Sequence, residues 1–391
     1  MEYRKVRFVE PAKLYLMIKD ELDAAYFDVM SKGELVDRSH LRNFENNLAK
    51  FVGTKYAVGL NSGYDSLHLS LRAAGIGKGH EVIVPAHTFV ASCSAIVNAG
   101  ATPVLVDVAK DFNIDVNKIE EAITPDTKAI MPVHLSGWMA DMPTIMKIAE
   151  KYNLLVIEDA CQSLGSCING KGAGSWGLTG CFSFYPFKIL GGYGDGGAIT
   201  TDNEEIATFA RRMRFNGEER QTGEYHGHGF TCLLDNMQAA FLDVKLKHLP
   251  DWIIRRKKIA ARYKDALSDI PDLLLPHYSR YGSVHVYQNY TVRSKQGNKF
   301  SEYLKNNGIE VLTQFRKPYY KHEALNLIDK GFPETETLSR EVCSLPMNVE
   351  IGDDEVEYVI GVVNLERLYT LREQLRGLDV FIVNTGRKGI K

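Results

Sequence analysis

The stretch TGCFSFYPFKILGGYGDGGAITT occupies residues 179–201, and Lys188 lies at its centre. Short apolar segments, residues 181–184 and 198–201, flank a turn that is rich in glycine, whose backbone can approach a ligand closely. Desolvation among aromatic residues and glycines would disfavour the lysine ammonium and leave a nucleophilic amine, suited to a Schiff base with a carbonyl compound. The alternative is a lysine at a strand end that reaches into water. The five glycines of the turn are Gly191, Gly192, Gly194, Gly196 and Gly197.

Strand-like and helix-like segments alternate along the chain before this stretch. Continuous apolar runs such as residues 154–157 are typical of strands buried on both faces. The alternation predicts an α/β fold, in which helices cover both faces of a mostly parallel sheet. Strands are expected at residues 81–85, 102–108, 128–135, 154–158, 180–184 and 197–201, and helices at 91–99, 116–123 and 142–152.

Polar or aromatic residues follow four of these strands. Ligands of open α/β sheets bind at the carboxyl ends of the strands, so these side chains are predicted to share one edge of the sheet. Each of two residues has a structural alternative to a ligand contact. Phe89 could pack in the core, and His134 could be a buried histidine whose hydrogen bonds are satisfied within the protein. The set comprises Phe89, His134, Asp159, Gln162 and Lys188.

Asp159 is the most informative of them. It ends an apolar strand, so we expect it to be partly buried, and a buried carboxylate needs a cationic partner. The protonated ring nitrogen of pyridoxal phosphate is such a partner. The alternative is a helix N-cap at a strand–helix junction.

A second candidate site lies nearer the N-terminus. Helical spacing predicts helices at residues 12–30 and 40–51, the second capped by Ser39. A short apolar run at residues 56–60 then leads through the turn NSGYDS into another helix. A strand, a turn of small residues and a helix N-terminus form an anion site from backbone N–H groups. A plain N-cap by Ser62 or Asp65 is the alternative.

Composition excludes several classes of protein. Of 391 residues, 45% are apolar and 25% charged, and the net charge of −2 gives no electrostatic case for nucleic acid or an anionic membrane. No stretch approaches the roughly 20 apolar residues of a membrane span, and the N-terminus lacks the apolar run of a signal peptide. The six cysteines form no CxxC pair, so we expect reduced thiols, no metal site and a cytoplasmic protein.

Six motifs in order give the chain a resemblance that spans residues 44–347. The sequence resembles the DegT/DnrJ/EryC1/StrS family of nucleotide-sugar aminotransferases, which are fold-type I pyridoxal-phosphate proteins. No single motif would be sufficient, but six in the right order are specific. They are SGYDSL (62–67), VPAHTF (84–89), HLSG (134–137), IEDACQ (157–162), FSFYPFKILGGYGDGGA (182–198) and DNMQAA (235–240).

The resemblance implies roles for individual residues. Lys188 matches the Schiff-base lysine and proton shuttle, and Asp159 matches the acid that holds the pyridine nitrogen. Gln162 matches the residue near the ring hydroxyl, and Phe89 the aromatic residue stacked on the ring. The residues that match the phosphate cradle are Gly63, Tyr64, Asp65 and Ser183.

The resemblance also implies a substrate site and a partner subunit. His134, Tyr185 and His322 match positions that line or close over the sugar, and members form homodimers with shared active sites. An asparagine of the family that reaches the partner's phosphate is replaced here by Thr231, and Leu233 replaces a basic residue. These departures leave the cross-subunit contact open. Members with histidine in place of the lysine are dehydratases, and Lys188 excludes that branch.

The pattern changes after residue 250. We expect a large cofactor-binding domain at residues 1–250 and a smaller α+β domain at 251–391. An amphipathic helix at 251–267 carries the basic run 255–258, interpreted as a solvated face, and residues 285–293 alternate like an exposed strand. A helix is expected at 353–372, and residues 378–391 are interpreted as a loose tail.

By resemblance, the chain is an aminotransferase that moves an amino group from an amino acid, glutamate, to a keto-sugar carried by a nucleotide. The sequence of residues 185–198 is more similar to that of members that aminate C3 of a dTDP-3-keto-6-deoxyhexose than to that of members that aminate C4. Two alternatives are a C4 aminotransferase acting on a 4-keto-6-deoxyhexose and a non-catalytic regulator on the same fold.

Overall fold

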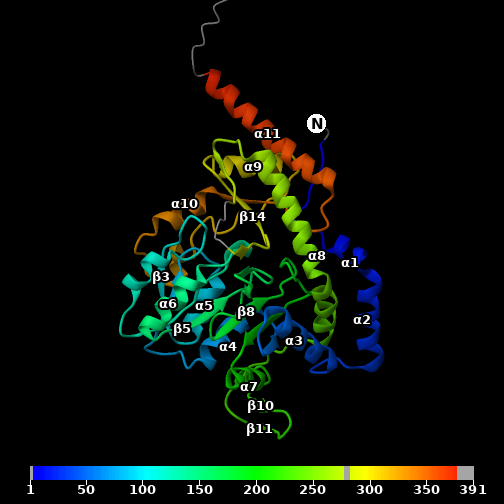
Figure 1. Ribbon diagram of the computed structural model, residues 1–391, viewed down its shortest axis with the longest axis vertical. Coiled ribbons are helices and arrows are strands. Elements are labelled where there is room, and N and C mark those ends of the chain that lie inside the picture. The colour runs from blue at the N-terminus through cyan, green and yellow to red at the C-terminus, as the bar shows by residue number, and fades with distance from the viewer. Residues whose placement is uncertain (1–2, 277–281, 377–391) are drawn as a thin grey trace, which may run out of the picture.

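A computed structural model describes residues 3–276 and 282–376, so the predicted tail at 378–391 lies outside the described residues. The main feature is a seven-stranded sheet with the order β1-β9-β8-β5-β4-β2-β3 (Figure 1). All neighbours from β3 to β8 are parallel, whereas β9 is antiparallel to β8 and β1. This confirms the predicted α/β class. The strands are β1 Tyr56–Leu60, β2 Glu81–Pro85, β3 Thr102–Val106, β4 Thr127–Ile130, β5 Leu155–Asp159, β8 Thr179–Ser183 and β9 Gly197–Thr201.

Three predicted elements of this region are shorter than expected. The strand predicted at 102–108 ends at Val106. The strand predicted at 128–135 ends at Ile130, because Pro132 has no N–H to donate to the ladder. Pairing resumes only as an isolated bridge between Val133 and Asp159. The helix predicted at 116–123 is a pair of 3-10 turns, η1 Val116–Lys118 and η2 Glu120–Ala122.

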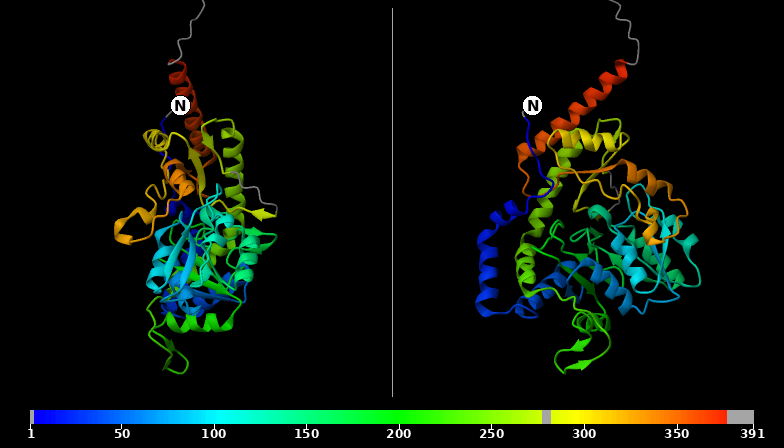
Figure 2. Two further views of the ribbon diagram at one scale, coloured as in Figure 1. Left: turned by 90° about the vertical axis from the view of Figure 1, so that its left-hand side faces the viewer. Right: turned by 180° about the vertical axis from the view of Figure 1, so that it is seen from behind.

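Helices cover both faces of the sheet (Figure 2). Val82 and Val84 belong to the core beneath α4 and α5, whereas Ile83 belongs to the core beneath α3, α6 and α8. This alternation follows from the period of two along a strand. The helices are α3 Ser39–Val52, α4 Gly63–Ala73, α5 Val90–Asn98, α6 Met142–Tyr152, α7 Glu204–Met213 and α8 Asn236–Leu267.

The N-terminal helices differ from the prediction in two respects. The helix expected at 12–30 is broken at Ile18, which has φ −129° and ψ 28°, into α1 Pro11–Met17 and α2 Lys19–Lys32. The prediction that Ser39 caps the next helix is wrong, because Arg38 occupies the N-cap position. Ser39 instead donates a hydrogen bond to the carboxylate of Glu34.

The long helix α8 runs from the large sheet toward α9 Asn298–Asn306 and α11 Asp353–Arg376 (Figure 1), and it contributes to two hydrophobic cores. Its residues up to Ile253 pack in the core of the large sheet, and those from Ile259 onward pack in a second core. The predicted boundary at 250/251 falls inside this helix and stays a prediction. The second core lies around a sheet of β12 Leu273–Leu274, β14 Tyr290–Ser294 and β15 Val342–Leu345, with α9 and α11. The helix α10 Pro333–Glu341 places Leu338 in a separate, smaller cluster.

Two surface predictions for this half are wrong. Residues 285–293 do not form an exposed strand, because His285, Val286, Tyr290 and Val292 are buried and β14 is the central strand of its sheet. The basic run 255–258 is not wholly solvated, because Arg256 is buried.

The remaining elements are short. They are β6 Cys167–Ile168, β7 Lys171–Gly172, β10 Glu218–Glu219, β11 Glu224–Tyr225, β13 Ser283–Val284, η3 Leu135–Gly137, η4 Tyr319–Lys321 and η5 Glu323–Leu325.

None of the helices in the described ranges combines the length and apolarity that a membrane crossing requires. All six cysteines are free thiols.

Candidate active site

A cavity of about 540 Å³ lies at the carboxyl ends of β2, β5 and β8 and at the N-terminus of α4. This is the position at which open α/β sheets bind ligands, and the volume is in the range of small-molecule sites. It brings together eight of the predicted residues. They are Gly63, Tyr64, Phe89, Asp159, Gln162, Ser183, Tyr185 and Lys188.

Lys188 belongs to the loop between β8 and β9, where its backbone N–H donates to the carbonyl of Tyr185 at 2.8 Å. Burial lowers the pKa of the Lys188 amine below its ordinary value, and the nearby Cys161 and Asp159 oppose part of that shift. The lysine therefore has the environment predicted for a nucleophilic amine rather than that of a surface side chain.

Asp159 ends β5 with its side chain in the same cavity and is 6% exposed. One carboxylate oxygen accepts the Ser92 hydroxyl at 2.8 Å, and the other accepts the Cys161 N–H at 3.2 Å. Both donors are neutral. No helix begins in residues 160–178, so the alternative of a helix cap does not describe this residue. The carboxylate is held in place and can still accept from a cationic ligand group.

The turn before α4 forms the opposite wall of the cavity. Ser62 is the N-cap, and its hydroxyl oxygen accepts the Asp65 N–H at 3.0 Å. The first N–H groups of a helix have no intrahelical acceptor, so those of Gly63 and Tyr64 suit an anion. A Cβ at Gly63 would lie 2.7 Å from the Cβ of Ser183, so only glycine allows this close approach.

Asp65 itself does not line the cavity, although its neighbours do. Its carboxylate accepts the Ser62 hydroxyl at 2.7 Å. Burial raises the pKa of Asp65, the Ser62 hydrogen bond opposes that shift, and the like charge of Asp195 adds to it. In this chain Asp65 therefore braces the turn.

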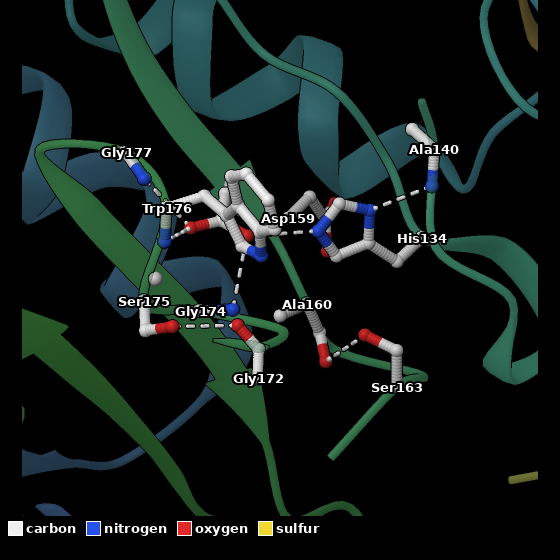
Figure 3. Close-up of polar contacts among 12 residues, drawn as sticks. His134, Ala140, Asp159, Ala160, Ser163, Gly172, Gly174, Ser175, Trp176 and Gly177 are labelled. Carbon is white, nitrogen blue, oxygen red and sulfur yellow. Dashed lines mark hydrogen bonds and ion pairs between the residues drawn. The ribbon is translucent and has the colours of Figure 1, made fainter. Parts of the chain in front are cut away.

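The structure does not place His134 at the cavity. Its Nδ1 accepts the Ala140 N–H at 3.2 Å (Figure 3), and its Nε2 lies 3.0 Å from a Glu158 oxygen. Successive residues of an extended segment point to opposite faces. Val133 and Asp159 face the cavity, whereas His134 and Glu158 meet on the other face. The expected sugar contact of His134 is corrected to a satisfied buried histidine.

Two other predicted residues also lie outside the cavity lining. His322 is exposed, and the same segment contributes Gln314 and Phe315 to the cavity instead. Phe315 has φ +57°, uncommon for a bulky residue, and packs edge-on against His87 at 5.3 Å between ring centres. Thr231 donates a hydrogen bond to the side-chain oxygen of Asn216 at 2.9 Å.

Nine of the seventeen lining residues were not predicted as site residues, among them Thr88, Cys161 and Asp195. Thr88, Cys161 and Asp195 each stand beside a predicted residue or within the glycine-rich turn, but side-chain type alone gave no signal for them. Burial raises the pKa of the Cys161 thiol, so it remains protonated.

Comparison with known proteins decides the family. Residues 17–364 match the model of the DegT/DnrJ/EryC1/StrS aminotransferase family. The chain belongs to this family. Because the match covers most of the chain, this confirms the resemblance that the six motifs predicted and, with it, the fold type.

Individual members of this aminotransferase family are similar over nearly their full lengths. The dTDP-3-amino-3,6-dideoxy-alpha-D-galactopyranose transaminase of Aneurinibacillus thermoaerophilus is 40% identical over 92% of this chain and 99% of its own. A pleiotropic regulatory protein of Geobacillus stearothermophilus is 37% identical over 91% of this chain and 96% of its own. The crystal structure of S. venezuelae DesV in complex with a ketimine intermediate is 37% identical, with a TM-score of 0.90, and covers 93% of this chain and 98% of DesV.

Proposed function

We propose that this protein transfers an amino group from glutamate to C3 of a dTDP-linked 3-keto-6-deoxyhexose. The observation that carries the proposal is the shared cavity of Lys188 and Asp159 at the N-terminus of α4. A desolvated amine, a buried carboxylate with neutral donors and an anion-binding helix end are the three groups that amino transfer with pyridoxal phosphate requires.

The cofactor is pyridoxal phosphate, and the residues of the cavity fit it. The N–H groups of Gly63 and Tyr64 with the Ser183 hydroxyl would hold the phosphate, and Asp159 would hold the protonated ring nitrogen. Bound pyridoxal phosphate supplies the carbonyl group for amino transfer and a ring that withdraws electrons.

The chain's own residues then supply positioning and proton transfer. Because burial lowers its pKa, Lys188 can both form the covalent link and, once released, accept and donate a proton at Nζ. The Ser92 hydroxyl and the Cys161 N–H hold the Asp159 carboxylate in position for the ring. Phe89, which is 58% exposed, offers a flat apolar surface for the ring within the cavity.

The choice of C3 rests on the relatives. The Aneurinibacillus relative is a transaminase named for a 3-amino sugar, whereas nothing in the cavity favours a 4-keto sugar. The Geobacillus relative raises the alternative of a regulator. A regulator without catalysis has no need of a desolvated lysine beside a buried carboxylate, so we favour the enzyme.

We also propose that the enzyme works in the cytoplasm as a homodimer with shared active sites. The free cysteines agree with a reducing compartment. Large apolar side chains stay exposed on α1 and α2, among them Leu16, Met17 and Phe27, which supports burial against a second subunit.

The decisive experiment supplies the enzyme with ¹⁵N-glutamate and one keto-sugar at a time. The candidates are dTDP- and UDP-linked 3-keto and 4-keto 6-deoxyhexoses, and the product is read by NMR. The expected result is ¹⁵N on C3 of the dTDP-linked 3-keto sugar. Label on C4 would overturn the proposed position of amination but not the proposed amino transfer to a keto-sugar. Label in small keto acids alone would overturn the sugar substrate.

A further inference from the structure

A second cavity, of about 220 Å³, lies behind the loop that carries Lys188. Its walls come from that loop, the N-terminal segment, the middle of α8 and residues 348–350, which follow β15. Lys188 belongs to the lining of both cavities. An occupant of this second cavity would therefore touch the loop that positions the Lys188 amine.

Two buried cations line this second cavity. Lys245 is 2% exposed and Arg256 is 8% exposed. The Lys245 Nζ donates to the carbonyl of Gly191 at 2.7 Å and lies 3.7 Å from the centre of the Tyr193 ring. Arg256 Nη1 donates to the carbonyl of Tyr287 at 2.9 Å.

Neither cation forms an ion pair with a side chain of the described residues. A buried cation without an ion-pair partner is costly, because backbone carbonyls replace only part of its hydration. Burial accordingly lowers the pKa of Lys245 to about 8 and that of Arg256 to about 10, and the negative charge of Glu350 opposes part of each shift. At neutral pH both side chains still carry their charge, and Glu350 is the one acidic residue in the lining.

Two polar atoms in the same lining have no hydrogen-bond partner. They are the donor Arg256 Nε and the acceptor Asn348 Oδ1, both buried. The Asn348 amide nitrogen donates to the carbonyls of Arg7 and Phe8, so the amide oxygen is the atom of this side chain that lacks a hydrogen bond. A complementary ligand must therefore carry both an acceptor and a donor.

We propose that this cavity binds a small carboxylate that also carries a hydroxyl or amino group. The carboxylate would accept from Lys245 and Arg256, and the hydroxyl or amino group would donate to Asn348 Oδ1. The volume excludes a nucleotide sugar, so this ligand is distinct from the proposed sugar substrate. The inference does not depend on which sugar the catalytic cavity accepts.

The test is calorimetric titration of the holoenzyme with glycolate, a carboxylate with a hydroxyl group and no transferable amine. We expect saturable binding, weaker binding of propionate, which lacks the donor, and a loss of about tenfold or more in the Lys245→Met variant, because a charge-assisted hydrogen bond is removed. Lys247→Met is the matched control, since Lys247 is exposed on the same helix. It should bind glycolate as the wild type does.

A second readout uses Trp252, which lines this cavity, whereas Trp138 and Trp176 do not. Saturable quenching of tryptophan emission by glycolate, lost in Trp252→Phe, would support the site even if Lys245→Met failed to fold. Absence of saturable binding in the wild type, or equal affinity in the wild type and Lys245→Met, would overturn the proposal.

Discussion

At the scale of single residues, Lys188 is the centre of the proposed chemistry. We expect Lys188→Ala to lose turnover, because the lysine is both the covalent partner and the proton carrier. General acid–base help alone is worth roughly 10² to 10⁴ in rate. The measurement is 2-oxoglutarate formation from glutamate and keto-sugar, with Lys247→Ala, an exposed lysine, as the control. Wild-type turnover in Lys188→Ala would contradict the assignment.

Asp159 permits a substitution that changes charge and little else. In Asp159→Asn, the amide oxygen can still accept the Cys161 N–H, and the amide nitrogen can donate to the Ser92 hydroxyl oxygen. We therefore expect a large loss of turnover with a change of only a few °C in melting temperature, because the charge-assisted bond to the ring nitrogen becomes a neutral one. The same substitution at an exposed aspartate, Asp126→Asn, is the control. An unchanged rate would leave Asp159 with a purely structural role.

Lys245 gives a pH-dependent prediction for stability. Its pKa is about 8 in the folded chain and 10.5 in an ordinary lysine. Between these values the unfolded chain binds the proton and the folded chain does not, so stability rises with pH across this window. The upper bound is about 3 kcal/mol, since each unit of pKa corresponds to about 1.4 kcal/mol.

The comparison that isolates this effect is the melting temperature of the wild type against Lys245→Met. The difference should move in favour of the wild type as the pH rises from about 8 to 10.5 and stay constant between pH 6 and 7. A difference that is flat across the upper window would contradict burial of the ammonium.

At the scale of elements, the contact between β9 and the turn before α4 sets the phosphate cradle. A Cβ at Gly197 would lie 2.2 Å from the Ser62 carbonyl oxygen and 2.7 Å from the Gly63 nitrogen. Both are backbone atoms, so Gly197→Ala must displace the helix N-terminus. We expect weaker retention of pyridoxal phosphate, measured by equilibrium dialysis, and a cost of about 1–3 kcal/mol in stability.

Gly77→Ala is the matched control for that substitution. Its Cβ would meet the Ala99 carbonyl oxygen at 3.4 Å, an ordinary contact, and its φ is not positive. It should retain the cofactor as the wild type does. If Gly197→Ala also does so, the cradle does not depend on this approach.

At the scale of the whole molecule, the proposed dimer can be tested by light scattering. We expect a mass twice the 43.9 kDa of one chain. Phe27 on α2 is 71% exposed, and Phe27→Asp should shift the population toward monomer because a buried charge at an interface is costly. Ile328→Asp, at a 69% exposed position just after η5, is the control. A wild-type monomer would refute the dimer.

Local sequence patterns were enough to predict the class of fold, the family and the centre of the site. Apolar runs predicted the strands at 81–85 and 197–201 with the bounds that the structure gives. Lys188, Asp159 and the turn at residues 62–65 stood out because their chemistry is local: a glycine-rich loop, a strand end and a helix start. Such features depend on neighbours in the chain, so a sequence displays them directly.

Which side chains face the cavity could be learned only from the packing of the folded chain. A shift of one position along an extended segment reverses the side, so His134 points to Glu158 while Val133 faces the site. Tertiary packing also buried Arg256 within a run of basic residues that looked solvated. Both outcomes depend on contacts between distant segments, and a pattern read along one segment does not contain the position of the other.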